Sequence, residues 1–71
     1  MIEQSQLDNW FQYHAPTPEQ VEKYSKLRDG GKLLAEMIVL YTPPCADQTA
    51  VIRLLREALM TANAAIACGG K

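Results

Sequence analysis

Proline placement is the strongest constraint on how this chain can fold. Pro16 and Pro18 follow the first segment of the chain, and Pro43 and Pro44 follow the second. Proline lacks a backbone N–H and its ring clashes with the preceding turn of a helix, so a long helix can run between these sites but not through them. The sequence therefore predicts a short N-terminal helix and two longer helices joined by a sharp turn.

The first segment, Ile2–Phe11, carries one loose apolar stripe. Its members are Ile2, Leu7, Trp10 and Phe11. A helix this short is marginal without tertiary packing. We therefore expect the segment to lie against the rest of the chain, like a lid.

The second segment opens with a strong helix start. The Thr17 side chain can accept a hydrogen bond from the backbone N–H of Gln20, the Gln20 side chain can bond back to Thr17, and Pro18 suits the first helical position. Apolar residues then recur at every third or fourth position, as on one face of a helix: Val21, Tyr24, Leu27, Gly31, Leu34, Ile38 and Tyr41. Within this run, Gly30 and Gly31 are either simply tolerated or allow a neighbouring helix or ligand to approach closely.

The third segment predicts a long helix from Cys45 or Ala46 to about Cys68, where two glycines end it. One apolar stripe contains Val51, Leu54, Leu55, Ala58, Ala62 and Ala65, and a second contains Ile52, Leu59, Asn63 and Ile66. Two stripes indicate contact with the partner helix and with another subunit. The expected fold is all-α: a short N-terminal helix plus an antiparallel two-helix hairpin, one domain over residues 1–71, assembled into a homo-oligomer.

Chain length and composition support self-association. A chain of 71 residues is near the lower limit for a self-sufficient core. Cys45, Cys68 and His14 are too few for a four-ligand zinc site; the cysteines are either reduced or joined in one disulfide. We expect no metal and no cofactor, which leaves oligomerisation as the source of extra buried area.

The net charge of −1 argues against a DNA or RNA polymer as partner, because such partners require a surplus of Lys and Arg. The first ten residues lack the basic region of a signal peptide, and the longest apolar run is too short for a membrane span. We expect no membrane partner.

Most charges on the long helices have an opposite charge four residues away: Glu19–Lys23, Glu22–Lys26, Lys32–Glu36 and Arg53–Glu57. Arg28 differs, because its neighbours at that spacing are Tyr24 and Lys32. Two cations on one face could clamp an anion. The alternative is a salt bridge from Arg28 to a carboxylate of another subunit.

Three further polar or aromatic residues have two interpretations each. Tyr13 and His14 precede the second segment and could stack on a nucleobase, or could be packing residues at a bend. Asn63 interrupts an apolar stripe, and a buried amide must find hydrogen-bond partners. It could fix the register between subunits or reach a ligand. No nucleophile–base motif or glycine-rich phosphate loop is present, so we do not expect an enzyme.

Two strings of sequence carry a family resemblance. Residues 13–20, Tyr-His-Ala-Pro-Thr-Pro-Glu-Gln, and residues 60–67, Met-Thr-Ala-Asn-Ala-Ala-Ile-Ala, together with the double proline between them, closely resemble the phage anti-CBASS cyclic-oligonucleotide sponges. The resemblance covers roughly residues 11–67. It implies a helical homohexamer, a trimer of dimers, that binds cyclic dinucleotides between two protomers and, in many members, cyclic trinucleotides nearer the threefold axis.

The resemblance also implies roles for particular residues. Tyr13 would stack on a base and Arg28 would neutralise a phosphate, with Lys26 and Lys32 as further basic candidates. His14 would add a hydrogen bond or shape the bend, and Asn63 is the candidate on the last helix. The function implied is capture of the messenger, without cleavage, in the cytoplasm of the infected bacterium, which starves antiphage effectors.

The chain departs from the family pattern in two places. Cys45 and Ala46 stand where relatives carry Ser and Arg, and Cys68 stands where relatives often carry Arg. Loss of the latter Arg puts trinucleotide binding in doubt. The alternatives to a sponge are a structural helical adaptor without a nucleotide ligand and an enzyme that hydrolyses the nucleotide.

Overall fold

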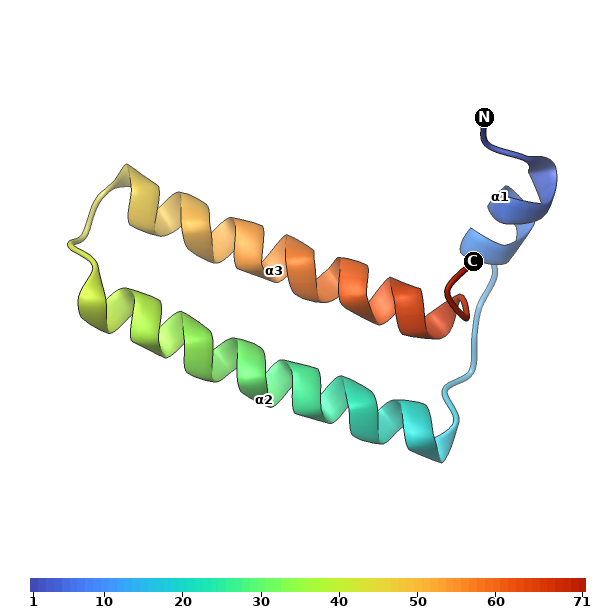
Figure 1. Cartoon of the computed structure of the whole chain (residues 1–71), viewed down its shortest axis with the longest axis horizontal. Helices are drawn as coiled ribbons and strands as arrows, with labels where there is room; N and C mark the ends of the chain where they lie inside the picture. The colour runs from blue at the N-terminus through green and yellow to red at the C-terminus, as the bar shows by residue number, and fades with distance from the viewer.

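Two long antiparallel helices make up most of the molecule. The computed structural model describes all 71 residues and contains three helices, α1 (Gln4–Trp10), α2 (Pro18–Tyr41) and α3 (Ala46–Ala67), and no strand. Helices α2 and α3 lie side by side as a hairpin, and α1 lies beyond the open end of the hairpin, beside the C-terminus (Figure 1). This confirms the predicted all-α hairpin with a short N-terminal helix.

Local sequence signals set where the helices begin. The Thr17 hydroxyl accepts a hydrogen bond from the Gln20 N–H at 3.2 Å, and the Gln20 side-chain oxygen accepts one from the Thr17 N–H at 3.0 Å. Helix α1 begins at Gln4, two residues later than predicted, because the Gln6 side chain accepts a hydrogen bond from the Glu3 N–H at 2.8 Å and so marks Glu3 as the cap.

The turn between α2 and α3 is tied together by side chains. The Thr42 hydroxyl donates to the Ile38 carbonyl at 2.6 Å. The Gln48 amide donates to the Thr42 carbonyl at 3.2 Å, to its hydroxyl at 3.1 Å, and to the Val39 carbonyl at 3.4 Å. Cys45 occupies the N-cap of α3 and makes no side-chain capping bond. Gln48, and not the cap residue Cys45, therefore provides the side-chain bonds that join the start of α3 to the end of α2.

The hairpin interface is a single layer of half-buried side chains. Gly31 is the only fully buried residue, because the Leu59 side chain occupies the space where a side chain at Gly31 would begin. A Cβ at that position would lie 3.1 Å from Leu59 Cδ2 and 3.2 Å from its Cγ, whereas nothing lies within 4 Å of one at Gly30. Close approach of a neighbouring helix therefore accounts for Gly31 and not for Gly30.

Helix α3 contacts α2 through members of both predicted stripes. Its half-buried residues include Ile52, Leu55, Leu59, Ala62 and Ile66, while Val51, Leu54, Ala58 and Ala65 stay exposed. Contact with α2 therefore involves both stripes, and contact with another subunit stays a prediction. The face of α3 that contacts α2 lies between the two predicted stripes, so it includes residues from both.

A single chain does not enclose a hydrophobic core. No hydrophobic side chain is fully buried, and large apolar residues are exposed along both long helices, among them Leu33, Met37, Leu40, Leu54 and Met60. Even the predicted inner face of α2 is partly open, since Val21 is 51% exposed and Tyr41 77% exposed. One partner helix can cover only one side of another, so the outer apolar surface is left uncovered.

The two cysteines lie at opposite ends of α3 and both are free. A helix of 22 residues is about 33 Å long, whereas a disulfide requires Cα atoms within about 7 Å. This excludes a disulfide between Cys45 and Cys68 within one chain. None of the helices combines the length and apolarity needed to cross a membrane.

Candidate functional site

Tyr13 lies in the bend that connects α1 to α2, at the open end of the hairpin. Its side chain is 85% exposed and makes no hydrogen bond. An aromatic ring exposed in this way is accessible for stacking. The structure therefore places Tyr13 where the sequence interpretation requires an accessible ring, although no other predicted site residue except His14 lies in this bend.

His14 faces inward and shapes the bend. It is half-buried, and its Nε2 lies 2.6 Å from the Asn9 carbonyl oxygen. Because a carbonyl only accepts, Nε2 must carry the proton and donate it. Of the two roles considered for His14, the structure favours shaping the bend over presenting a hydrogen bond to a ligand.

The three basic candidates lie along α2 and are all exposed. Lys26 pairs with Glu22 at 3.3 Å, the only ion pair in the chain; the other three predicted pairs do not form. Arg28 and Lys32 therefore remain uncommitted to any carboxylate. Arg28 is ten residues, about 15 Å, along α2 from Pro18, so the chain does not bring it next to the bend that carries Tyr13.

Asn63 is exposed on α3 and makes no hydrogen bond within the chain. The sequence interpretation treated it as a buried amide on an apolar stripe. Within one chain, α2 covers Leu59, Ala62 and Ile66 and leaves Asn63 on the uncovered side, so neither of its two predicted roles is tested here. A role in fixing subunit register or reaching a ligand would require a second protomer.

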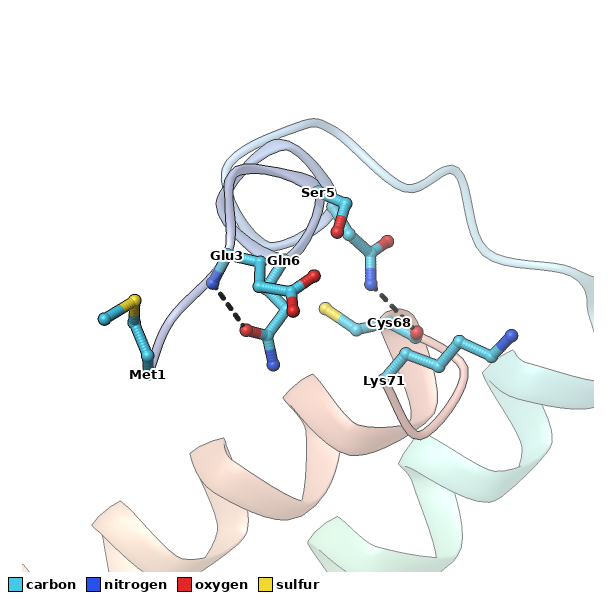
Figure 2. A pocket seen from close by; sticks show the side chains of 7 residues that line it. Met1, Glu3, Ser5, Gln6, Cys68 and Lys71 are labelled. Carbon is cyan, nitrogen blue, oxygen red and sulfur yellow. Dashed lines mark hydrogen bonds between the residues drawn. The ribbon is translucent and has the colours of Figure 1, made fainter.

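One hollow lies between α1 and the C-terminus (Figure 2). It measures about 530 Å³ and is lined by Met1, Glu3, Ser5, Gln6, Asn9, Cys68 and Lys71. Within it, the Asn9 side-chain amide donates to the Cys68 carbonyl at 3.2 Å. Sequence reasoning did not single out Asn9, because nothing in the spacing of a seven-residue helix indicates a partner 59 residues away.

A second hollow lies near the turn, lined by Val39, Gln48, Thr49, Ile52, Arg53 and Arg56. Sequence reasoning assigned Arg53 to a pair with Glu57 that does not form, and it missed that two arginines share one groove. Nowhere do three or more His, Cys, Asp or Glu side chains gather in a way that could hold a metal ion. The candidate residues of the single chain thus lie apart and form no closed site.

Comparison with known proteins adds one finding. The family model described as Acb2/Tad1, hairpin domain, matches residues 3–67, which is most of the chain and includes all three helices. Neither the curated proteins nor the solved structures that were compared with the chain gave a match.

Proposed function

Because this chain belongs to the Acb2/Tad1 hairpin family, which is the anti-CBASS protein 2 family, we propose that it is a sponge that captures cyclic dinucleotides intact. The family match over residues 3–67 is the observation that carries the proposal. Capture of the messenger would starve the antiphage effectors of the infected bacterium in whose cytoplasm the protein acts.

The geometry of the site supports a ligand shared between protomers. Tyr13 is accessible at the open end of the hairpin, and Arg28 is accessible farther along α2 without a carboxylate partner. A base would stack on Tyr13 and a phosphate would receive bidentate hydrogen bonds from Arg28. Because one chain holds these groups apart, a pocket at a protomer interface is the arrangement in which both would serve one ligand.

We further propose that the protein is a homo-oligomer, a hexamer built as a trimer of dimers. The absence of a buried core and the exposed apolar residues of both long helices support self-association. The hexamer number comes from the family resemblance. Lys32 and Asn63, which have no intrachain partner, would then lie where a second protomer or the ligand can meet them.

The proposed action is binding alone, without catalysis, metal or cofactor. No nucleophile–base motif is recognisable in the sequence. Cyclic trinucleotides should bind weakly or not at all, because Cys68 is half-buried and supplies no cation.

The test is isothermal titration of the purified protein with cyclic di-GMP, cyclic di-AMP, cyclic GMP–AMP and cyclic tri-AMP. A pocket on a twofold axis predicts about one cyclic dinucleotide for every two chains. Denaturation of the complex should release the ligand unchanged, as judged by chromatography. Release of a linear nucleotide would support an enzyme, and no heat with any member of the panel would overturn the sponge.

The structural adaptor is the competing function, and the exposed apolar surface is the observation that favours it. Arg28→Ala separates the two, with Arg56→Ala as a matched control because both arginines are exposed and unpaired. A sponge predicts loss of nucleotide binding by Arg28→Ala alone, with the oligomer intact. An adaptor predicts a weaker oligomer for Arg28→Ala and no nucleotide binding by any form.

A further inference from the structure

The bend that carries Tyr13 has almost no support from its own backbone. The last backbone hydrogen bond of α1 runs from the Phe11 N–H to the Leu7 carbonyl, and the first bond of α2 runs from the Val21 N–H to the Thr17 carbonyl. Residues 12–16 take part in no backbone–backbone hydrogen bond. Tyr13 itself is exposed and makes no side-chain bond, so other groups must fix where its ring lies.

Three side chains supply that support. His14 Nε2 donates to the Asn9 carbonyl at 2.6 Å and closes the bend on itself. Asn9 Nδ2 donates to the Cys68 carbonyl at 3.2 Å, the bond drawn to Cys68 in Figure 2, and ties the α1 side of the bend to the end of α3. On the other side of the bend, Gln20 Nε2 donates to the Ile66 carbonyl at 3.3 Å.

The bond from Gln20 depends on both ends of its amide. The oxygen accepts from the Thr17 N–H and completes the start of α2, while the nitrogen reaches α3. The carbonyls of Ile66 and Cys68 each accept one backbone bond, from Gly69 and Lys71, and a carbonyl oxygen has a second lone pair that can accept from a side-chain amide. The bend is therefore clamped to α3 on both sides of Tyr13.

We propose that Asn9, His14 and Gln20 are positioning residues that hold the bend so that Tyr13 is set for the nucleobase before the ligand arrives. This inference rests on the proposed sponge function and assigns these residues no ligand contact. A bend that is already ordered loses less conformational entropy on binding, which makes binding tighter.

The primary variant is Asn9→Leu, which removes the amide donor without adding charge. The matched control is Gln12→Leu, a similar change in the same part of the chain on a side chain with no hydrogen-bond partner. Titration with cyclic GMP–AMP should show roughly fivefold weaker binding for Asn9→Leu, as loss of one hydrogen bond implies, and no change for the control. Amide hydrogen exchange of Phe11, whose N–H donates to the Leu7 carbonyl just before the bend, should accelerate in Asn9→Leu alone.

A second variant keeps the inference testable should Asn9→Leu disturb α1. Gln20→Glu retains the oxygen that accepts from Thr17 but loses the donor to Ile66. Gln12→Glu adds the same charge without breaking a bond and is its control. We expect Gln20→Glu to weaken binding more than Gln12→Glu does.

A mutant cycle with Tyr13→Ala distinguishes positioning from general stability. If Asn9 acts through Tyr13, Asn9→Leu should cost little once the ring is gone. Wild-type affinity in both Asn9→Leu and Gln20→Glu, or an equal loss with and without Tyr13, would overturn the positioning role while leaving the sponge intact. Failure of the wild-type protein to bind any of the four cyclic nucleotides would overturn the sponge, and this role with it.

Discussion

The two ends of the hairpin are held by the same chemistry over very different distances in sequence. At the turn, the Gln48 amide bonds to carbonyls six and nine residues away. At the open end, the amides of Gln20 and Asn9 bond to carbonyls 46 and 59 residues away. In both places a side-chain amide donates to the last carbonyls of a long helix, at Val39 and Thr42 or at Ile66 and Cys68.

This difference separates a part of the molecule that local sequence can close from a part that only the assembled hairpin can close. The turn brings its partners together whenever the two helices meet at the prolines, so its bonds order few additional residues. At the open end, α2 and α3 must already lie side by side before any bond can form. The end that carries the candidate ligand residue Tyr13 is therefore the one most sensitive to how the helices pack.

The largest expected effect comes from prying the helices apart between the two ends. Gly31→Leu places a side chain where Leu59 already lies, and overpacking of this kind costs about 1–3 kcal/mol. The matched change Gly30→Leu meets open space and should stabilise by about 1 kcal/mol through helix propensity. Denaturant unfolding at fixed protein concentration measures both.

Hydrogen exchange in Gly31→Leu then tests the comparison itself. Amides of residues 66–70 should lose protection more than the hydrogen-bonded amides of residues 38–42 and 49–52 beside the turn, because the open end depends on long-range bonds. Equal loss of protection at both ends would show that the hairpin opens as one unit and that the two ends do not differ in stability.

The next effect concerns ligand affinity at each end. Tyr13→Ala should weaken cyclic GMP–AMP binding by about 10- to 100-fold, because stacking of one base on an aromatic ring contributes about 1–3 kcal/mol. Tyr41→Ala is the control at the turn, since that ring is also largely exposed, at 77%. Titration of both variants, at an unchanged oligomeric state, measures the two affinities. An equal loss of affinity in both variants would show that the ligand site is not at the open end.

A smaller effect is expected from the side chain that closes the turn. Gln48→Leu removes the donor shared by Thr42 and Val39, which should lower the free energy of unfolding by about 1 kcal/mol. Ligand affinity should stay the same, because the turn lies at the far end of the hairpin from Tyr13. Gln12→Leu serves as the control for loss of an amide without partners, and a drop in nucleotide affinity with Gln48→Leu would contradict the separation of the two ends.

The smallest effect is a gain at the start of α3. Cys45→Ser supplies a hydroxyl that can accept from the free backbone N–H groups of the first turn, which should stabilise by about 0.5–1 kcal/mol. Cys68→Ser at the other end of α3 is the control, because a residue at the C-terminal end of a helix gains nothing from such an acceptor. Thermal unfolding of both variants compares them, and a gain from Cys68→Ser of the same size would point to general removal of thiols instead.

The sequence by itself determined the elements of this protein. The prolines, the Thr17–Gln20 capping pair and the terminal glycines define where the long helices start and stop, because these signals act over three or four residues. The same local reasoning named Tyr13 and Arg28 as candidates and predicted self-association, and both stay predictions. It placed the start of α1 too early, since it overlooked the bond between Gln6 and Glu3.

Tertiary structure alone decided what those elements do to one another. Packing of the two helices brings Leu59 against Gly31 and not against Gly30, and it buries residues from both stripes of α3. It leaves Asn63 exposed, while His14 bonds to the Asn9 carbonyl. It also joined Asn9 to Cys68 and Gln20 to Ile66. Periodicity specifies the buried face of a helix only to within a fraction of a turn. Hydrogen bonds between residues far apart in sequence leave no spacing signal. These contacts and bonds therefore form only once the two helices have packed together.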